Sequence, residues 1–122
     1  MGTPLSKAEE FLTAAKLAAN ESLWDACAVL CYASLYWAAI TALEKGGFHE
    51  RRWSHGGLKD TFTAEVTQKK KLYPPTFGRW LKDAYDLRVA AQYRASGANL
   101  KQARRMLSHV DEFVAKVKER CT

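Results

Sequence analysis

The spacing of apolar residues along the chain predicts five helices. Apolar positions recur every three or four residues at about 6–20, 22–45, 57–69, 76–93 and 100–117, which is the period of a helix with one buried face. No segment shows the apolar–polar alternation that is typical of a strand. Because the connections are short, sequential neighbours are expected to pack antiparallel. The pattern predicts an all-α protein built as a five-helix, mainly antiparallel up-and-down bundle.

Polar residues and glycines set the expected helix boundaries. Ser6, with Glu9 three positions later, is predicted to open the first helix as a capping box, and Ser22 is predicted to cap the second. Gly46 and Gly47 are expected to end that second helix, because glycine adopts the left-handed conformation at low cost. Asn99 is predicted to cap the fifth helix.

An arginine lies within the apolar face of the predicted helix 76–93. That face contains Phe77, Leu81, Ala84 and Ala91, and Arg88 falls among them. Burying a guanidinium without a partner is costly. An inward-facing arginine is therefore either paired with a carboxylate or kept for a ligand.

The neighbours of Arg88 favour a phosphate ligand. Tyr85 lies three residues before Arg88 and Gln92 four after it, so the three share a helix face, and Tyr93 closes the helix. A guanidinium presents donors that match phosphate oxygens. We expect this face to bind a nucleotide or the backbone of RNA. The alternative is an ion pair with a carboxylate from another helix or subunit.

Length and cysteine usage narrow the class of protein. The 122 residues form one expected domain, 1–122. The chain has an odd number of cysteines, Cys27, Cys31 and Cys121, which argues against a disulfide scaffold. The first two are expected to be small buried hydrophobic residues. No cluster of cysteine and histidine has ligand spacing, so we expect no metal and no cofactor. No secretory signal is recognised, and cytoplasmic localisation is the default expectation.

The uncharged run 26–43 is close to the length of a membrane span. It is rich in alanine, cysteine and tyrosine, it contains Ser34 and Thr41, and no basic cluster flanks it. We therefore interpret it as the central helix of a bundle, or as a subunit interface, and expect no membrane association.

Charge is unevenly distributed along the chain. Residues 1–48 carry three lysines and five acidic residues, net −2, whereas residues 49–122 carry 16 basic and eight acidic residues, net +8. Lys70 and Lys71 belong to a basic run that is followed by Tyr73, a combination that suits single-stranded nucleic acid. The second half is therefore expected either to bind an anionic partner or to form a solvated basic surface.

His55 is the candidate for proton chemistry. It stands in the sequence TrpSerHisGlyGly at the start of the third predicted helix, and the glycines after it allow a ligand to approach the backbone. The alternative is a histidine that only forms hydrogen bonds with the backbone at the helix start.

Three segments together resemble the HEPN domain family. Residues 31–43 resemble the family's second helix, SerHisGlyGlyLeu at 54–58 with Phe62 resembles its His-Ser/Lys-Gly turn and following Phe, and residues 87–93 resemble its Leu-Arg-x-x-Ala-Asp-Tyr motif. The resemblance implies a five-helix bundle that forms homodimers. It also implies a toxin–antitoxin type of system, since many relatives are partners of a small nucleotidyltransferase.

The resemblance also implies a possible ribonuclease, which this chain matches only in part. Catalytically active relatives are metal-independent ribonucleases with an Arg-x(4–6)-His signature at the dimer cleft, and its arginine corresponds to Arg88. Residues 93–95 are Tyr, Arg and Ala, so the histidine is missing. Cleavage would need a general base, for which His55 and Tyr93 are the candidates beside Arg88.

We therefore expect a homodimeric nucleotide- or RNA-binding module that acts with a nucleotidyltransferase. The two alternatives are a metal-independent ribonuclease with an incomplete signature, and a structural adaptor that dimerises without a ligand.

Overall fold

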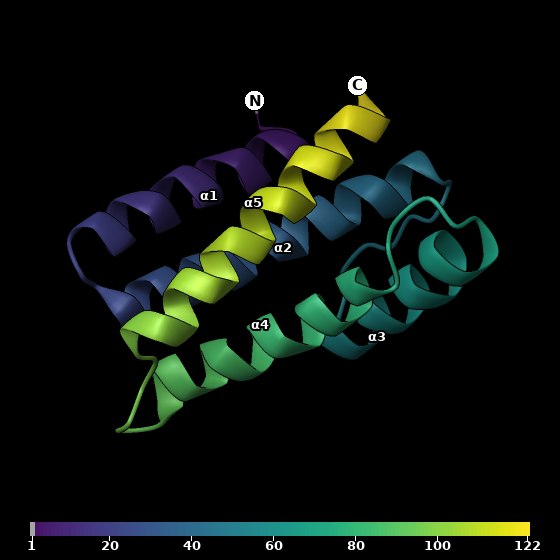
Figure 1. Ribbon diagram of the computed structural model, residues 1–122. Helices are drawn as coiled ribbons and strands as arrows, with labels where there is room; N and C mark the ends of the chain where they lie inside the picture. The colour runs from purple at the N-terminus through teal and green to yellow at the C-terminus, as the bar shows by residue number, and fades with distance from the viewer. Residues whose placement is uncertain (1) are drawn as a thin grey trace.

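The computed structural model describes residues 2–122, and all its regular structure is helical (Figure 1). The elements are α1 (Pro4–Asn20), α2 (Trp24–Lys45), α3 (His55–Thr61), the π-helix η1 (Phe62–Lys69), α4 (Thr76–Tyr93) and α5 (Leu100–Cys121). Helix α3 continues directly into η1, so the two form one helical arm. The prediction of an all-α, five-helix bundle is confirmed.

Helix α2 is the centre of the bundle. It packs against α1, α4 and α5, whereas α5 packs mainly on α2 and α1 and makes few contacts with α4. In Figure 1, α1 and α4 run in one direction and α2 and α5 in the other, so α1 is antiparallel to α2 and α4 is antiparallel to α5. By length and composition α2 could cross a membrane, but 56% of its apolar stretch is buried inside the bundle. This is the burial expected of a central helix.

Stacked phenylalanines attach the α3–η1 arm to the bundle. The rings of Phe77 and Phe113 lie 4.5 Å apart, those of Phe62 and Phe113 lie 5.4 Å apart, and all three side chains are fully buried. Leu81 and Ala84 continue the buried face of α4, as the spacing predicted. This core fixes α3 and α4 side by side.

Two predicted helix starts were wrong. Thr3, not Ser6, is the N-cap of α1, and Ser6 is instead the third helical residue, whose hydroxyl accepts from the Thr3 backbone N–H at 2.7 Å. Pro4 explains the earlier start, because its fixed φ suits the first helical turn. Ser22 has a φ of 58° and lies in the tight turn between α1 and α2, so it cannot act as the cap. Leu23 precedes α2 without a side-chain cap.

Other boundary predictions are confirmed. Gly46 is the C-cap of α2, and the left-handed residue is Gly47, with a φ of 92°. Asn99 forms a reciprocal capping box with Gln102, with hydrogen bonds of 2.8 and 3.1 Å. The third helix begins at His55, two residues earlier than expected, with Ser54 as its cap.

The heptad spacing of the apolar residues predicts a buried stripe on α5 made of Leu100, Ala103, Leu107, Val110, Val114 and Val117. This prediction was partly wrong. Leu100 is 47% exposed and Leu107 only partly buried, whereas Met106 and Phe113 are buried. The helix crosses over α2 and α1 rather than lying along α4, so a rotated face points inward.

Candidate functional site

Arg88 projects from α4 toward α2, as its position in the apolar face predicted. Its side chain is partly buried, and its Cζ lies 5.4 Å from the ring centroid of Tyr32 on α2 and 5.9 Å from that of Tyr85 on α4. A guanidinium at such distances is attracted to the faces of aromatic rings. The arginine is therefore held between two tyrosines at the seam of α2 and α4.

The tyrosines form a connected aromatic set. Tyr32 is 9% exposed and meets Tyr85 edge to face, with centroids 5.6 Å apart. Tyr36 lies one turn further along α2, with its centroid 6.1 Å from that of Tyr32, and its hydroxyl donates to the Trp53 carbonyl at 2.8 Å. That hydrogen bond ties the segment before α3 to α2. The position of His55, at the start of α3, is fixed in consequence.

His55 contacts the same two tyrosines as Arg88. Its ring stacks on Tyr85 with centroids 4.0 Å apart and planes 13° apart, and its Nδ1 lies 3.2 Å from the Tyr32 hydroxyl oxygen. The structure thus gathers residues from α2, α3 and α4. We call Tyr32, His55, Tyr85 and Arg88 the tyrosine–arginine cluster.

Burial sets the protonation of this cluster. It raises the pKa of Tyr32 to about 12, against a smaller opposing effect of Arg88, so the phenol stays protonated at neutral pH. Burial, with a smaller contribution from Lys59, lowers the pKa of His55, which favours a neutral imidazole. If the Tyr32 hydroxyl donates to Nδ1, the ring proton sits on Nε2, and His55 becomes a donor for an anionic oxygen.

Arg88 has no carboxylate partner among residues 2–122: no ion pair there joins it to an aspartate or glutamate. Asp86, two residues away, is exposed and pairs with Lys82 at 2.8 Å. The carboxylate alternative therefore finds no partner within the described chain, and the guanidinium's hydrogen-bonding groups remain available.

Two further candidates lie beyond Arg88 on the last turn of α4. Gln92 and Tyr93 are both exposed, Tyr93 at 72%. They stand at the solvent side of the helix end, where they form a rim and not part of the buried cluster.

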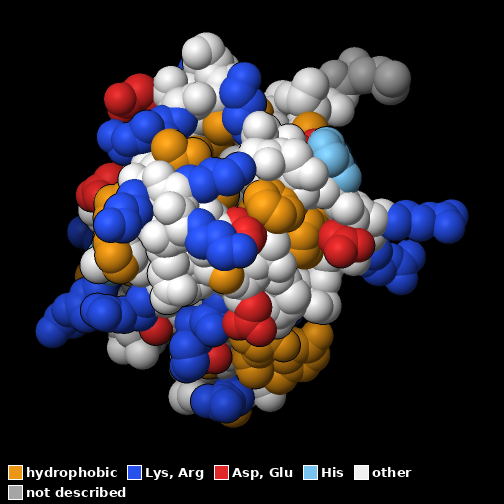
Figure 2. All heavy atoms as spheres, turned by 90° about the vertical axis from the view of Figure 1, so that its right-hand side faces the viewer, with side chains coloured by type: hydrophobic (Ala, Val, Ile, Leu, Met, Phe, Trp, Pro, Cys, Tyr) orange, Lys and Arg blue, Asp and Glu red, His pale blue; other side chains and the backbone are white. Residues whose placement is uncertain are grey.

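The lysine run lies at the far end of the bundle. The Lys70 Nζ donates to the Gly46 carbonyl at 3.2 Å, at the end of α2. Tyr32 is 14 residues earlier on α2, about 21 Å away at the rise of an α-helix. Lys71, with a φ of 53°, lines a separate cleft with Arg120. Figure 2, which faces that end, shows lysine and arginine side chains spread over the surface, with fewer acidic ones.

The spacing of Tyr32 and Tyr36 on one face of the second helix predicts core or interface packing, with base stacking as the alternative, so Tyr32 was not among the predicted site residues. It is buried, but it also contacts both Arg88 and His55. The signal for its second role was weak, because its spacing from Tyr36 fits a core stripe equally well.

The fold and the cluster define an all-α domain in which an inward arginine lies among tyrosines beside a loop-end histidine. A family model described as HEPN domain matches residues 3–120, and the chain belongs to this family. Membership supports a nucleotide- or RNA-related module in general terms. A search among curated proteins returned no match.

Proposed function

We propose that this protein binds a nucleotide or RNA through the tyrosine–arginine cluster, as a homodimer that works with a nucleotidyltransferase in a toxin–antitoxin type of system. One observation carries the proposal: a partly buried guanidinium lies against two tyrosine rings without a carboxylate partner among residues 2–122. A charge kept away from water without an ion pair is expensive. A phosphate that arrives with the ligand supplies the missing counter-charge.

The chemistry of the cluster suits phosphate better than proton abstraction. Arg88 offers a planar set of donors, and a neutral His55 with its proton on Nε2 adds one more. Tyr32, whose pKa burial raises further above neutrality to about 12, is protonated, and its hydroxyl orients that imidazole. The site therefore presents donors to an anion and lacks a strong base in this tautomer.

The surroundings favour a longer anionic ligand. Residues 49–122 carry a net charge of +8, which raises the local concentration of nucleic acid. The exposed rings and amides of Tyr93 and Gln92 extend beyond Arg88, where a base could stack. A short single-stranded RNA is thus a suitable probe.

The homodimer and the nucleotidyltransferase partner rest on the family. A homodimer would double the cluster and bring two copies of Arg88 into one particle. Mass measurement of the purified protein by light scattering tests the dimer, with one-chain mass as the contradicting result. Co-expression with a nucleotidyltransferase encoded beside the gene, followed by affinity purification, tests the partner.

RNA binding is measured by fluorescence anisotropy with a labelled single-stranded oligonucleotide, in a salt series. Arg88→Ala should weaken binding at least about tenfold, since a charge-assisted contact is lost. The matched control is Arg104→Ala, whose guanidinium lies 5.4 Å from the Trp24 ring, so it loses the same charge and the same kind of contact elsewhere. Equal effects of the two substitutions would refute the assignment of the ligand to this cluster.

A metal-independent ribonuclease is the second candidate, because His55 and Arg88 share one tyrosine pair. It requires the other tautomer, with Nδ1–H donating to the Tyr32 oxygen and Nε2 free to accept the 2′-hydroxyl proton. RNA incubated with chelator distinguishes the two. Cleavage that His55→Ala abolishes establishes the enzyme, and intact RNA that stays bound supports the binding module.

A further inference from the structure

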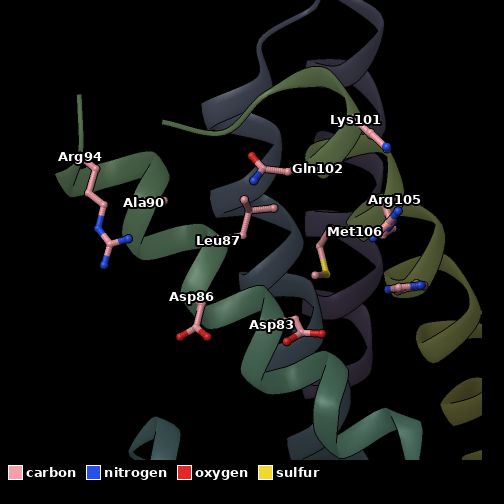
Figure 3. A pocket seen from close by; sticks show the side chains of 10 residues that line it. Asp83, Asp86, Leu87, Ala90, Arg94, Lys101, Gln102, Arg105 and Met106 are labelled. Carbon is pink, nitrogen blue, oxygen red and sulfur yellow. The ribbon is translucent and has the colours of Figure 1, made fainter. Parts of the chain in front are cut away.

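A cavity with both polar and apolar walls lies between α4 and α5, on the side of α4 away from the tyrosine–arginine cluster. It forms because α5 packs on α1 and α2 and makes few contacts with α4. The cavity has a volume of about 470 Å³, within the roughly 300–1,000 Å³ of small-molecule sites. Figure 3 shows Leu87 from α4 and Gln102 and Met106 from α5 facing the space between the helices. We call it the α4–α5 groove.

One wall of the α4–α5 groove is a row of donors on α5. Lys101, Arg105 and His109 lie four residues apart along the helix, so they share a face, and all three line the groove. No ion pair within residues 2–122 involves Lys101 or Arg105. The first turn of α5 carries no acidic residue, so the positive end of the helix dipole adds to this wall.

His109 has a defined orientation in that row. Its ring stacks on Trp80, with centroids 4.2 Å apart and planes 4° apart, and its Nδ1 is buried without a hydrogen-bond partner. Buried unpaired N–H groups are rarer in proteins than unpaired acceptors, so the ring proton belongs on Nε2. Since Nδ1 is buried and His109 lines the groove, we infer that Nε2 is the ring nitrogen on the groove side, where it adds a donor on the same wall as Arg105.

The α4 wall carries Asp83 and Asp86, with Arg94 at its end, and the floor is apolar. Asp83 comes from α4 and takes part in no ion pair among residues 2–122, and Leu87 and Met106 lie between the two walls. A ligand that fits has an anionic end for α5, an apolar or flat body for the floor and a donor edge for Asp83.

We propose that the α4–α5 groove is a second ligand site, for a small phosphate ester with a flat body, the size of a nucleoside monophosphate. The phosphate lies against Arg105, Lys101 and His109, and an amino edge of the body faces Asp83. Arg88 does not line this groove, so ligand binding there can be tested separately from the proposed RNA binding.

The chain provides its own reporter for this site. Its methionines are Met1 and Met106, and Met106 is 5% exposed and lines the groove. Protein labelled with ¹³C at the methionine methyls is titrated with AMP, inorganic phosphate or adenosine. AMP should shift the Met106 signal saturably, phosphate should bind more weakly, and adenosine should be weakest, because it lacks the anion. No saturable shift with AMP would overturn the proposal.

Neighbouring arginines supply the matched variants. Arg105→Ala should weaken AMP binding at least about tenfold. Arg104→Ala, one residue away but directed at Trp24, should change it less than about twofold. Arg88→Ala should leave the Met106 titration unchanged while weakening RNA binding. Equal losses in Arg104→Ala and Arg105→Ala would overturn the site.

Asp83→Ala tests which way the ligand lies. Removing a carboxylate strengthens the binding of inorganic phosphate, because a like charge disappears. The same change should weaken AMP, whose amino group loses its acceptor. If both ligands bind more tightly to Asp83→Ala, the assignment of the amino edge to Asp83 is refuted.

Discussion

Replacing Arg88 by methionine separates a ligand-binding arginine from a structural one. Methionine keeps an unbranched side chain of comparable reach and removes the guanidinium. The structure gives Arg88 two tyrosine contacts, at 5.4 and 5.9 Å from Cζ, and no carboxylate among residues 2–122. We therefore infer that the guanidinium acts mainly in ligand binding and contributes little to the free energy of folding.

The magnitudes distinguish the two roles. Cation–π contacts contribute about 0.5–1 kcal/mol each where solvent still reaches them, so about 1–2 kcal/mol is lost with the guanidinium of the partly buried Arg88. Methionine recovers part of this through its contacts with the aromatic rings and by removing a desolvated charge. The free energy of unfolding should change by no more than about 1 kcal/mol. Breaking a buried ion pair would instead remove about 3–5 kcal/mol.

Urea denaturation of the wild type and Arg88→Met measures this difference directly, with Arg104→Met as the control for loss of an arginine over a ring. A change of 1 kcal/mol corresponds to a shift in Tm of about 4 °C for a domain of this size. A loss of about 3 kcal/mol or more in Arg88→Met alone would refute the reasoning, because it would mean that the guanidinium has a structural partner in the assembled protein.

Three further predictions concern stability. Burial lowers the pKa of His55 and of His109 from the usual 6.5, so as the pH falls the unfolded chain takes up protons before the folded one. The free energy of unfolding should therefore be constant above pH 6.5 and decline below it. Replacing both histidines by Gln should reduce that decline, as measured by urea denaturation at several pH values. Gly97→Ala should lower stability by about 1–3 kcal/mol, measured by thermal denaturation, because Gly97 has a φ of 61° and a Cβ there meets the Asp25 carboxylate; an unchanged Tm would contradict this. Phe113→Ala should lose about 3–5 kcal/mol in urea denaturation, because its fully buried ring stacks within the core, and a loss under about 1 kcal/mol would show that the core relaxes around the cavity.

The helices were predictable from sequence because their buried faces are long and regular. Phe77, Leu81 and Ala84 lie on one face of α4, and that periodicity survives any choice of neighbouring helix. The Asn99 cap of α5 was predictable for a different reason, because capping depends only on residues close in sequence. The prediction of Ser22 as an N-cap was wrong because Ser22 lies in the tight turn between two packed helices, where its backbone is left-handed and not in the extended conformation of a cap.

The site was predictable only where a single helix determines it. The shared face of Tyr85 and Arg88 follows from helical spacing. The contact of His55 with Tyr32 does not follow from helical spacing, because the two residues are 23 positions apart in the chain and meet only through the packing of α3 against α2. The α4–α5 groove follows from where α5 crosses the bundle, which no periodicity in α4 or α5 alone reveals.

The central claim is that the guanidinium of Arg88 contacts a phosphate-bearing ligand, and its own NMR signal tests this most directly. In protein with ¹⁵N-labelled arginine, the Arg88 Nε–H resonance is assigned by its absence from Arg88→Lys and followed during titration with a single-stranded RNA oligonucleotide. We predict a saturable shift at Arg88, with the Nε–H signal of Arg104 serving as the internal reference. An Arg88 resonance that stays in place while the RNA binds elsewhere would contradict the account.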